Sequence, residues 1–141
     1  TLPTGTEPRQ VVAADLDADG DMDLVTANFA SENLTLHFQT EAGVFTASPV
    51  ALYSGQGCVA VAAADLDGDG DMDLVSANET ASSMKMWIQT SPGGFTESPA
   101  SLAVGNGPIW VTAADLDGDG DLDLVSANRV SENLTVLFNG K

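Results

Sequence analysis

Short apolar runs, separated by polar turn residues, recur along the whole chain. In the middle of the sequence they cover residues 59–64, 74–77, 84–89 and 95–104, with Gly, Pro, Ser or Asp clusters between them. The runs contain β-branched and aromatic residues, and none shows the apolar stripe with a 3.6-residue period that a helix requires. The pattern therefore predicts an all-β protein in which each group of four runs forms four strands.

This group of four strands recurs with a period of 50 residues. The period divides the chain, a single domain over residues 1–141, into repeats near 11–60, 61–110 and 111–141. A repeat of this length is typical of propellers and solenoids. The first run of each repeat is rich in alanine, as expected for strands that crowd around a central axis, and the outer runs carry Phe and Trp. These features predict a β-propeller with three four-stranded blades in this chain.

An acidic segment with the pattern Asp-x-Asp-x-Asp-Gly-Asp-x-Asp-Leu follows the first run of each repeat. The segments at 15–24, 65–74 and 115–124 hold 15 of the 21 acidic residues. Carboxylates this close repel one another unless a cation binds them, and calcium accepts six to eight oxygen ligands in flexible geometry. Gly at the sixth position allows a sharp turn. We expect three calcium ions per chain.

In each loop the side chains at positions 1, 3, 5 and 9 and the backbone carbonyl at position 7 are the predicted ligands. They are Asp15, Asp17, Asp19, Asp21 and Asp23; Asp65, Asp67, Asp69, Asp71 and Asp73; and Asp115, Asp117, Asp119, Asp121 and Asp123. The same opening pattern begins an EF-hand loop. An EF-hand, however, needs a bidentate Glu at position 12 and flanking helices, whereas Thr26, Ser76 and Ser126 stand there between predicted strands.

The stretch AADLDGDGDMDLVSAN at 63–78 resembles the signature of the FG-GAP, or integrin-alpha-type, calcium-binding β-propeller repeats. Gly-Asn-Gly-Pro at 105–108 and Gly-Gly-Phe-Thr at 93–96 are similar to that family as well. The first repeat departs mildly, because Ala18 replaces a Gly and residues 5–8 read Gly-Thr-Glu-Pro. The resemblance implies that the calcium loop joins strands one and two on one propeller face. It also implies that ligands meet the 4–1 and 2–3 loops on the other face.

The number of repeats predicts a partner. Propellers have four to eight blades, so three blades do not close a ring. Residues 1–5 align with 101–105, and we expect residues 1–10 to supply a fourth strand to a last blade that stops after its third strand. Two chains joined head to tail would then form a six-bladed homodimer with exchanged strands. The alternative is that the three blades belong to a longer propeller.

The net charge of −17 restricts the remaining partners and the location. It disfavours nucleic acid and anionic membrane surfaces. No run of 18 or more apolar residues occurs, so a soluble chain without a membrane span is expected. Calcium loops of modest affinity fill where calcium is plentiful, which predicts an extracellular, periplasmic or cell-surface location.

Little in the sequence indicates catalysis. The single histidine, His37, aligns with Trp87 and Leu137, which predicts a packing role, and the lone Cys58 is expected to pack as a small apolar residue. No nucleophile–base arrangement can be assembled around one histidine. We therefore expect a protein that is not an enzyme.

The predicted function is a calcium-stabilised binding module, similar to propeller lectins and adhesion domains, that engages carbohydrate or extracellular protein. The alternatives are a structural or assembly piece of a larger propeller, and a non-catalytic part of an enzyme acting on polysaccharides or lipids. Phe29, Glu79 and Arg129 differ at one matched position, which disfavours identical sugar sites. The candidate ligand contacts are Asn28, Asn78, Asn128, Gln56, Asn106 and Trp110.

Overall fold

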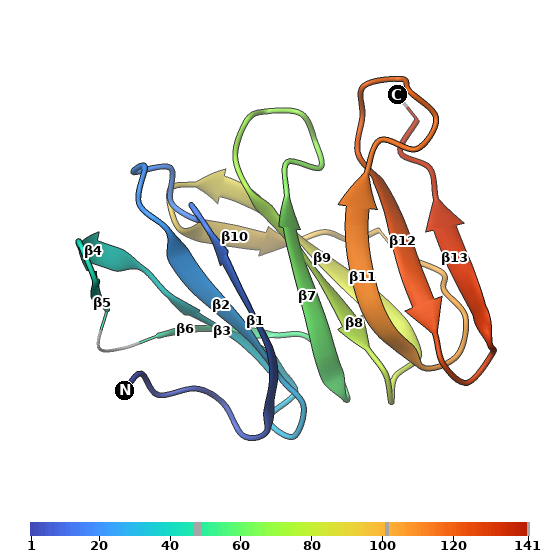
Figure 1. Ribbon diagram of the computed structural model, residues 1–141, viewed down its shortest axis with the longest axis horizontal. Coiled ribbons are helices and arrows are strands. Elements are labelled where there is room, and N and C mark those ends of the chain that lie inside the picture. Colours follow the sequence, from blue (N-terminus) through green and yellow to red (C-terminus); the bar gives the residue numbers. More distant parts are fainter. Residues whose placement is uncertain (47–48, 101, 141) are drawn as a thin grey trace.

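The structure is a computed structural model that describes residues 1–46, 49–100 and 102–140 (Figure 1). These residues form antiparallel β-sheets and no helix, which confirms the all-β prediction. Accordingly, the described part of the chain has no helix long and apolar enough to cross a membrane.

Three sheets follow one another along the chain, and a short ribbon branches from the first. The first sheet has the order β1-β2-β3-β6, formed by Pro8–Ala14, Asp23–Asn28, Asn33–His37 and Val50–Tyr53, and the ribbon pairs β4 (Gln39–Glu41) with β5 (Val44–Phe45). The second sheet has the order β10-β9-β8-β7, with β7 Cys58–Ala64, β8 Asp73–Asn78, β9 Ser83–Ser91 and β10 Gly94–Glu97. The third has the order β11-β12-β13, with β11 Pro108–Ala114, β12 Asp123–Asn128 and β13 Asn133–Leu137.

The outer strand is shorter than the sequence predicts. The predicted strand over 95–104 is wrong in extent: β10 ends at Glu97, and Leu102 then forms an isolated bridge with Met84. Pro99 lies between these two pairings, and proline cannot donate a backbone hydrogen bond to a sheet. In the first repeat, Pro49 likewise separates the β4–β5 ribbon from β6.

The first hairpin of every sheet has the same register. Ala14 pairs with Asp23, Ala64 with Asp73 and Ala114 with Asp123, so each acidic segment closes a hairpin at the same point. Each hairpin also has one register shift near its other end, between Pro8 and Gln10 in the first sheet and at the matched positions in the others. The repeat in sequence is therefore a repeat in backbone geometry.

The three sheets pack face to face in a propeller-like fan, with β1, β7 and β11 side by side (Figure 1). We call the face of a sheet that points toward the next sheet in the chain its forward face, and the opposite one its rear face. Forward Val25 and Leu36 of the first sheet pack with rear Val61 and Trp87 of the second.

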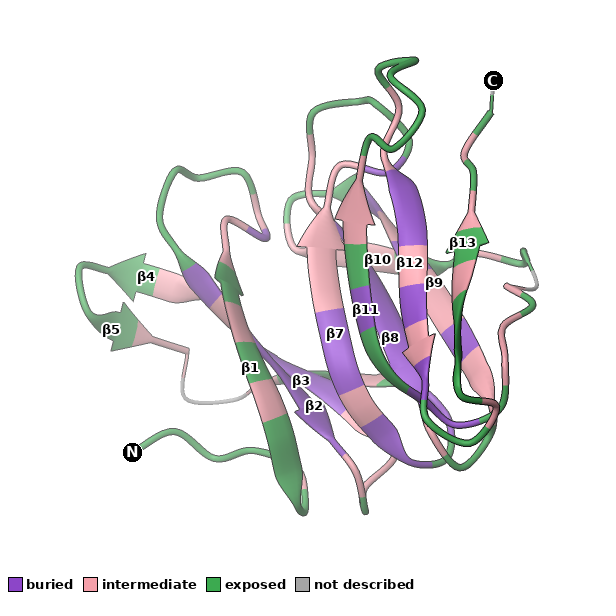
Figure 2. Ribbon diagram, turned by 45° about the vertical axis from the view of Figure 1, so that its right-hand side comes forward, coloured by how far each residue is buried: buried purple, intermediate pink, exposed green. Residues whose placement is uncertain are grey.

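A second core lies between the second and third sheets. Forward Val75 and Met84 of the second sheet pack there with rear Val111 and Leu124 of the third. Both faces of the second sheet are therefore covered, whereas the exposed residues of β1 and β13 lie at the two sides of the fan (Figure 2).

Candidate metal centres

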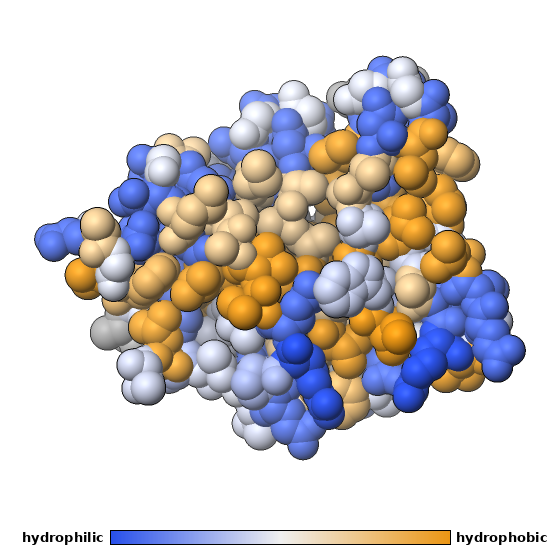
Figure 3. Space-filling view, in the orientation of Figure 1, coloured by the Kyte–Doolittle hydropathy of each residue, from blue (hydrophilic) through white to orange (hydrophobic). Residues whose placement is uncertain are grey.

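The three acidic segments form the loops β1–β2, β7–β8 and β11–β12, which all project from the same end of the fan (Figure 1). These loops are strongly hydrophilic, while hydrophobic side chains gather over the side that carries β12 and β13 (Figure 3). Gly20, Gly70 and Gly120 have φ angles of 94°, 99° and 97°, a region that side chains disfavour. The sixth position of each loop therefore requires glycine.

The fourth position distinguishes the first loop from the other two. Gly68 and Gly118 have φ angles of 79° and 82°, and Ala18 takes a similar angle of 60° in the first loop. A left-handed backbone costs a residue with a Cβ about 1–2 kcal/mol. Ala18 therefore strains the first loop.

The first aspartate of each loop bends the backbone around its own carboxylate. Asp65 accepts hydrogen bonds from the backbone N–H groups of Gly68 (2.7 Å) and Gly70 (3.0 Å). Asp115 accepts the matched pair, from Gly118 (2.7 Å) and Gly120 (3.2 Å). In the first loop Asp15 accepts from the backbone N–H groups of Asp19 (3.2 Å) and Gly20 (3.0 Å).

The ninth aspartate is fully buried and joins the loop to the end of the third strand. Asp73 Oδ2 accepts from Leu66 N (2.9 Å), and Asp73 Oδ1 accepts from Gln89 N (2.9 Å). Asp23 and Asp123 make the same two bonds in their own sheets. The sequence alone gave no sign of this second role, because the alternating pattern treats all carboxylates of the loop alike.

The carboxylates of each loop converge closely enough for three of them to hold a metal ion. Their oxygens lie within 4.8 Å of one another in the groups Asp15, Asp17 and Asp19; Asp65, Asp67 and Asp73; and Asp115, Asp117 and Asp123. The side chains of Asp21, Asp71 and Asp121 lie outside these groups. That arrangement suits residues predicted to bind through the backbone carbonyl.

The membership of the groups differs at two predicted positions. Asp23 lies outside the group of the first loop, and Asp69 and Asp119 lie outside those of the second and third. Asp19 Oδ1, Asp69 Oδ1 and Asp119 Oδ1 all accept from the backbone N–H two residues on, at 2.9 Å, so this bond does not explain the difference. The role of Asp23, Asp69 and Asp119 as metal ligands stays a prediction.

The electrostatics of the loops favour a cation. Burial raises the pKa of Asp23 and of Asp73, and the two backbone N–H groups bound to each carboxylate oppose that rise. Burial, followed by the charges of Asp23 and Asp19, also raises the pKa of Asp17. Asp17 Oδ1 is buried without a hydrogen-bond partner in the described part of the chain. An oxygen-seeking divalent ion would favour the charged carboxylates and satisfy this atom, so the donor set fits such an ion.

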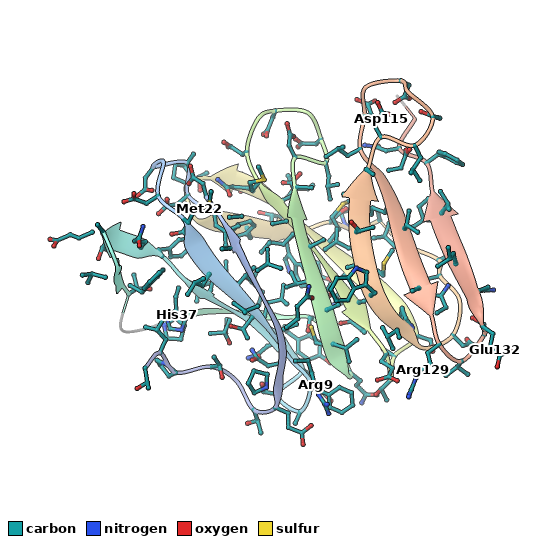
Figure 4. All side chains as sticks on the ribbon, in the orientation of Figure 1. Arg9, Met22, His37, Asp115, Arg129 and Glu132 are labelled. Carbon is teal, nitrogen blue, oxygen red and sulfur yellow. The ribbon has the colours of Figure 1, made fainter. Side chains whose placement is uncertain are left out.

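The opposite end of the fan carries the turns β2–β3, β8–β9 and β12–β13. Each turn is hydrogen-bonded to the residues directly before the first strand of its own sheet. Glu79 N donates to Gly57 O, and Arg129 N donates to Gly107 O, both at 2.8 Å. The side chains there differ between repeats. The guanidinium of Arg9 lies 4.9 Å from the ring centroid of Phe29, and Arg129 pairs with Glu79 of the neighbouring sheet. Figure 4 shows Arg9, Arg129 and Glu132 at this end, opposite Met22 and Asp115.

The structure separates the predicted ligand contacts into buried and exposed ones. Asn28, Asn78 and Asn128 are buried. Asn28 Nδ2 donates to Thr35 Oγ1 (2.8 Å) and Asn33 Oδ1 (3.0 Å), and Asn128 makes the matched bonds. The side chains of Asn28 and Asn128 fix their turns, whereas Asn78 Oδ1 accepts from Ser76 Oγ and its Nδ2 has no hydrogen-bond partner in the described part of the chain. A surface ligand would reach these buried side chains only after the turn opened. Gln56, Asn106 and Trp110 are exposed, and Trp110 lies on the forward face of the third sheet rather than in a turn.

The two other residues considered from sequence are both buried. His37 is 2% exposed; its Nδ1 lies 3.0 Å from Thr46 O and its Nε2 lies 2.7 Å from Pro3 O. Burial raises the pKa of the Cys58 thiol. These positions confirm the predicted packing roles.

A comparison with known families supports the assignment that the geometry suggests. The model of the FG-GAP-like repeat matches the chain twice, over residues 15–76 and 67–126. The chain belongs to the FG-GAP-like repeat family. No curated protein matches it significantly.

Proposed function

We propose that this chain is a calcium-stabilised module of a β-propeller and that the metal is structural. The observation that carries the proposal is the threefold convergence of carboxylates beside a buried aspartate that already joins each loop to its sheet. Calcium is the best candidate, because it takes many oxygen ligands in flexible geometry. The residues that would hold it are the five aspartates of each loop, with positions 1, 3, 5 and 9 acting through side chains.

We further propose that the module is not catalytic. The converging carboxylates are the proposed metal ligands, and the His37 ring lies between two backbone carbonyls. A metal ion surrounded by protein oxygens supports structure, whereas catalysis requires an open coordination position beside an acid, base or nucleophile.

The end of the fan opposite the acidic loops is the proposed binding surface for carbohydrate or protein. It combines a repeated backbone with side chains that vary between repeats, including the exposed Gln56, Asn106 and Arg129, of which Arg129 pairs with Glu79. Varied side chains on a fixed frame suit specific recognition. An extracellular, periplasmic or cell-surface location would supply the calcium that such loops need.

Calorimetric titration of the chelator-treated protein with calcium tests the metal part of the proposal. We expect three ions per chain, and the variant Asp67→Asn should lose one of them. The exposed variant Val44→Thr, on the β4–β5 ribbon, is the control and should bind three. Binding of no calcium would contradict the proposal.

A glycan array and a panel of extracellular matrix proteins, each probed with and without calcium, test the binding part. Calcium-dependent binding that weakens in the double variant Gln56→Ala/Asn106→Ala would support the proposed surface. Silence on both panels would remove the binding role and leave the structural alternative.

A further inference from the structure

The forward face of the third sheet is exposed where the other two sheets are covered. Leu134 in β13 is 68% exposed, whereas the matched Leu34 and Met84 are 0% and 4% exposed. Leu116, the second residue of the third acidic loop, is 50% exposed, while the matched Leu16 is fully buried. This face therefore has the composition of an interior surface without a sheet in front of it.

The rear face of the first sheet shows the complementary exposure. Val11 in β1 is 60% exposed, whereas the matched Val61 and Val111 are 1% and 2% exposed against the preceding sheet. Leu2, Leu24 and His37 line the same shallow hollow beside Val11. The two end faces of the fan thus correspond to the two faces that meet inside it.

Side-chain amides connect the second and third sheets to the acidic loop of the sheet before each of them. Asn139 Nδ2 donates to Leu66 O (2.8 Å). With its amide turned so that the nitrogen faces the loops, Gln89 Nε2 donates to Leu16 O (2.8 Å). Gln39 is the third member of this set, but its Oε1 accepts from Gly43 N, and in the described part of the chain its Nε2 has no hydrogen-bond partner.

These amide bridges and the buried aspartates form one continuous series of hydrogen bonds. Asp23 holds Leu16 N, and Gln89 binds Leu16 O while its own N–H binds Asp73. The same steps lead from Asp73 through Leu66 and Asn139 to Asp123, which holds Leu116 N. The series ends at Leu116 O on one side and at the side chain of Gln39 on the other.

We propose that the forward face of the third sheet docks on the rear face of the first sheet of a second copy of this chain. Gln39 of the second copy then donates to Leu116 O, which continues the series across the junction. Between the first two sheets, Gln10 Oε1 accepts from Val61 N (2.7 Å). Trp110 matches Gln10 and Val11 matches Val61, so Trp110 lies against Val11 of the second copy. Two such junctions give six sheets, within the range of known propellers, and a head-to-tail contact closes when its rotation completes a circle.

Residues 1–7, which precede β1, have the position that this junction requires. Phe29 N donates to Glu7 O (2.9 Å), just as Glu79 N donates to Gly57 O in the second sheet. Leu52 pairs with Leu34, and Leu102 bridges Met84. By the same spacing Leu2 would lie opposite Leu134 of the other copy. This inference goes beyond the proposed metal and binding roles, because it concerns the two side faces of the fan and a second copy of the chain.

Sedimentation velocity of the full chain in calcium, over a wide concentration range, tests the junction. We expect a species of twice the single-chain mass of 14.4 kDa. Val11→Glu and Leu134→Glu should each give a monomer, because each places a charge in one of the docking faces. Val44→Glu is the matched control: Val44 is 51% exposed on the β4–β5 ribbon, and this variant should associate like the parent.

Mixing the two monomeric variants tests the head-to-tail direction. One junction in the mixture joins two unaltered faces, so a heterodimer should reappear at higher concentration. A parent that stays monomeric would overturn the proposal, as would full association of either variant alone or no recovery on mixing. Circular dichroism checks folding, and Val11→Thr with Leu134→Thr replaces the pair if the charged variants do not fold.

The amide bridge has its own matched test. Gln39→Ala should raise the dissociation constant of the dimer by about 2- to 10-fold per junction, as expected for one lost hydrogen bond. It should lower the melting temperature of the isolated chain less than Gln89→Ala does, because the internal bond that it removes, to Gly43 N, is exposed. Gln89→Ala removes the internal bridge and should lower that melting temperature. Unaltered association of Gln39→Ala would refute this contact.

Discussion

The acidic loops at one end of the fan repeat the same contacts three times, whereas the turns at the other end keep their backbone contacts and change their side chains. Asp23, Asp73 and Asp123 make the same pair of hydrogen bonds in each sheet. At the other end, Phe29, Glu79 and Arg129 occupy one matched position. The loops therefore keep one geometry while the turns vary in surface chemistry, and this difference underlies the proposed division between a structural end and a binding end.

Removal of a buried aspartate should have the largest effect. Asp73→Ala leaves the N–H groups of Leu66 and Gln89 without their acceptor, so we expect a loss of about 2–5 kcal/mol in the free energy of unfolding. Asp71→Ala is the control, because that side chain lies outside the carboxylate group, and its effect should stay within about 0.5 kcal/mol. Urea unfolding in chelator measures both. Equal losses would mean that the ninth position has no special role.

The pH dependence of stability should change sign with calcium. The pKa values of Asp17, Asp23 and Asp73 are raised in the folded chain above the usual 3.8, so folding favours their protonated forms. The associated stability is complete below that usual value and is lost as the pH rises through the raised pKa values. In chelator, the urea midpoint should therefore rise as the pH falls from neutral toward 4.

With calcium bound, the same acidification should lower the midpoint, because protons compete with the ion for the carboxylates. Urea midpoints measured in parallel, with calcium and with chelator, distinguish the two slopes. Slopes of the same sign would argue against cation binding in the loops.

Exchanging Ala and Gly at the fourth loop position should change the free energy of unfolding by a smaller amount, with opposite signs in the first and second loops. Ala18→Gly should raise the free energy of unfolding by about 0.5–1 kcal/mol, because it relieves the left-handed strain at a modest entropic cost. Gly68→Ala should lower it by a similar amount. Denaturant titrations of both variants under one buffer condition measure the pair, and shifts in the same direction would contradict the strain assigned to Ala18.

The turns at the other end should tolerate change best. Arg129 has a side chain that is 65% exposed, so Arg129→Ala should cost at most about 1 kcal/mol despite its ion pair with Glu79. A double-mutant cycle with Glu79→Gln measures the coupling between the two residues. A coupling far above 1 kcal/mol would show that this end, too, is built mainly for stability.

The sequence predicted the parts of the fold that depend on periodicity. The first three strands of each repeat and the position of every acidic loop follow from the spacing of apolar runs and of Asp and Gly. The outer strand is shorter than predicted, because Pro99 interrupts the pairing even though apolar residues continue on both sides of it.

The candidate site was predictable in its residues but not in their division of labour. Which aspartate becomes buried depends on the end of the third strand, about 16 residues away in sequence, where Gln39, Gln89 and Asn139 supply the N–H groups. The burial of Asn28, Asn78 and Asn128 could not be predicted either. Each asparagine ends a strand beside a polar turn, and the sequence does not show whether its side chain faces solvent or the backbone of that turn. Such assignments require tertiary contacts.

Thermal unfolding in calcium and in chelator tests the structural role of the acidic loops most directly. A single site filled at 100 times its dissociation constant stabilises the folded state by about 2.7 kcal/mol, and three sites in one chain should multiply that effect. We predict a large rise in the melting temperature with calcium. An unchanged melting curve would contradict a structural calcium site in these loops.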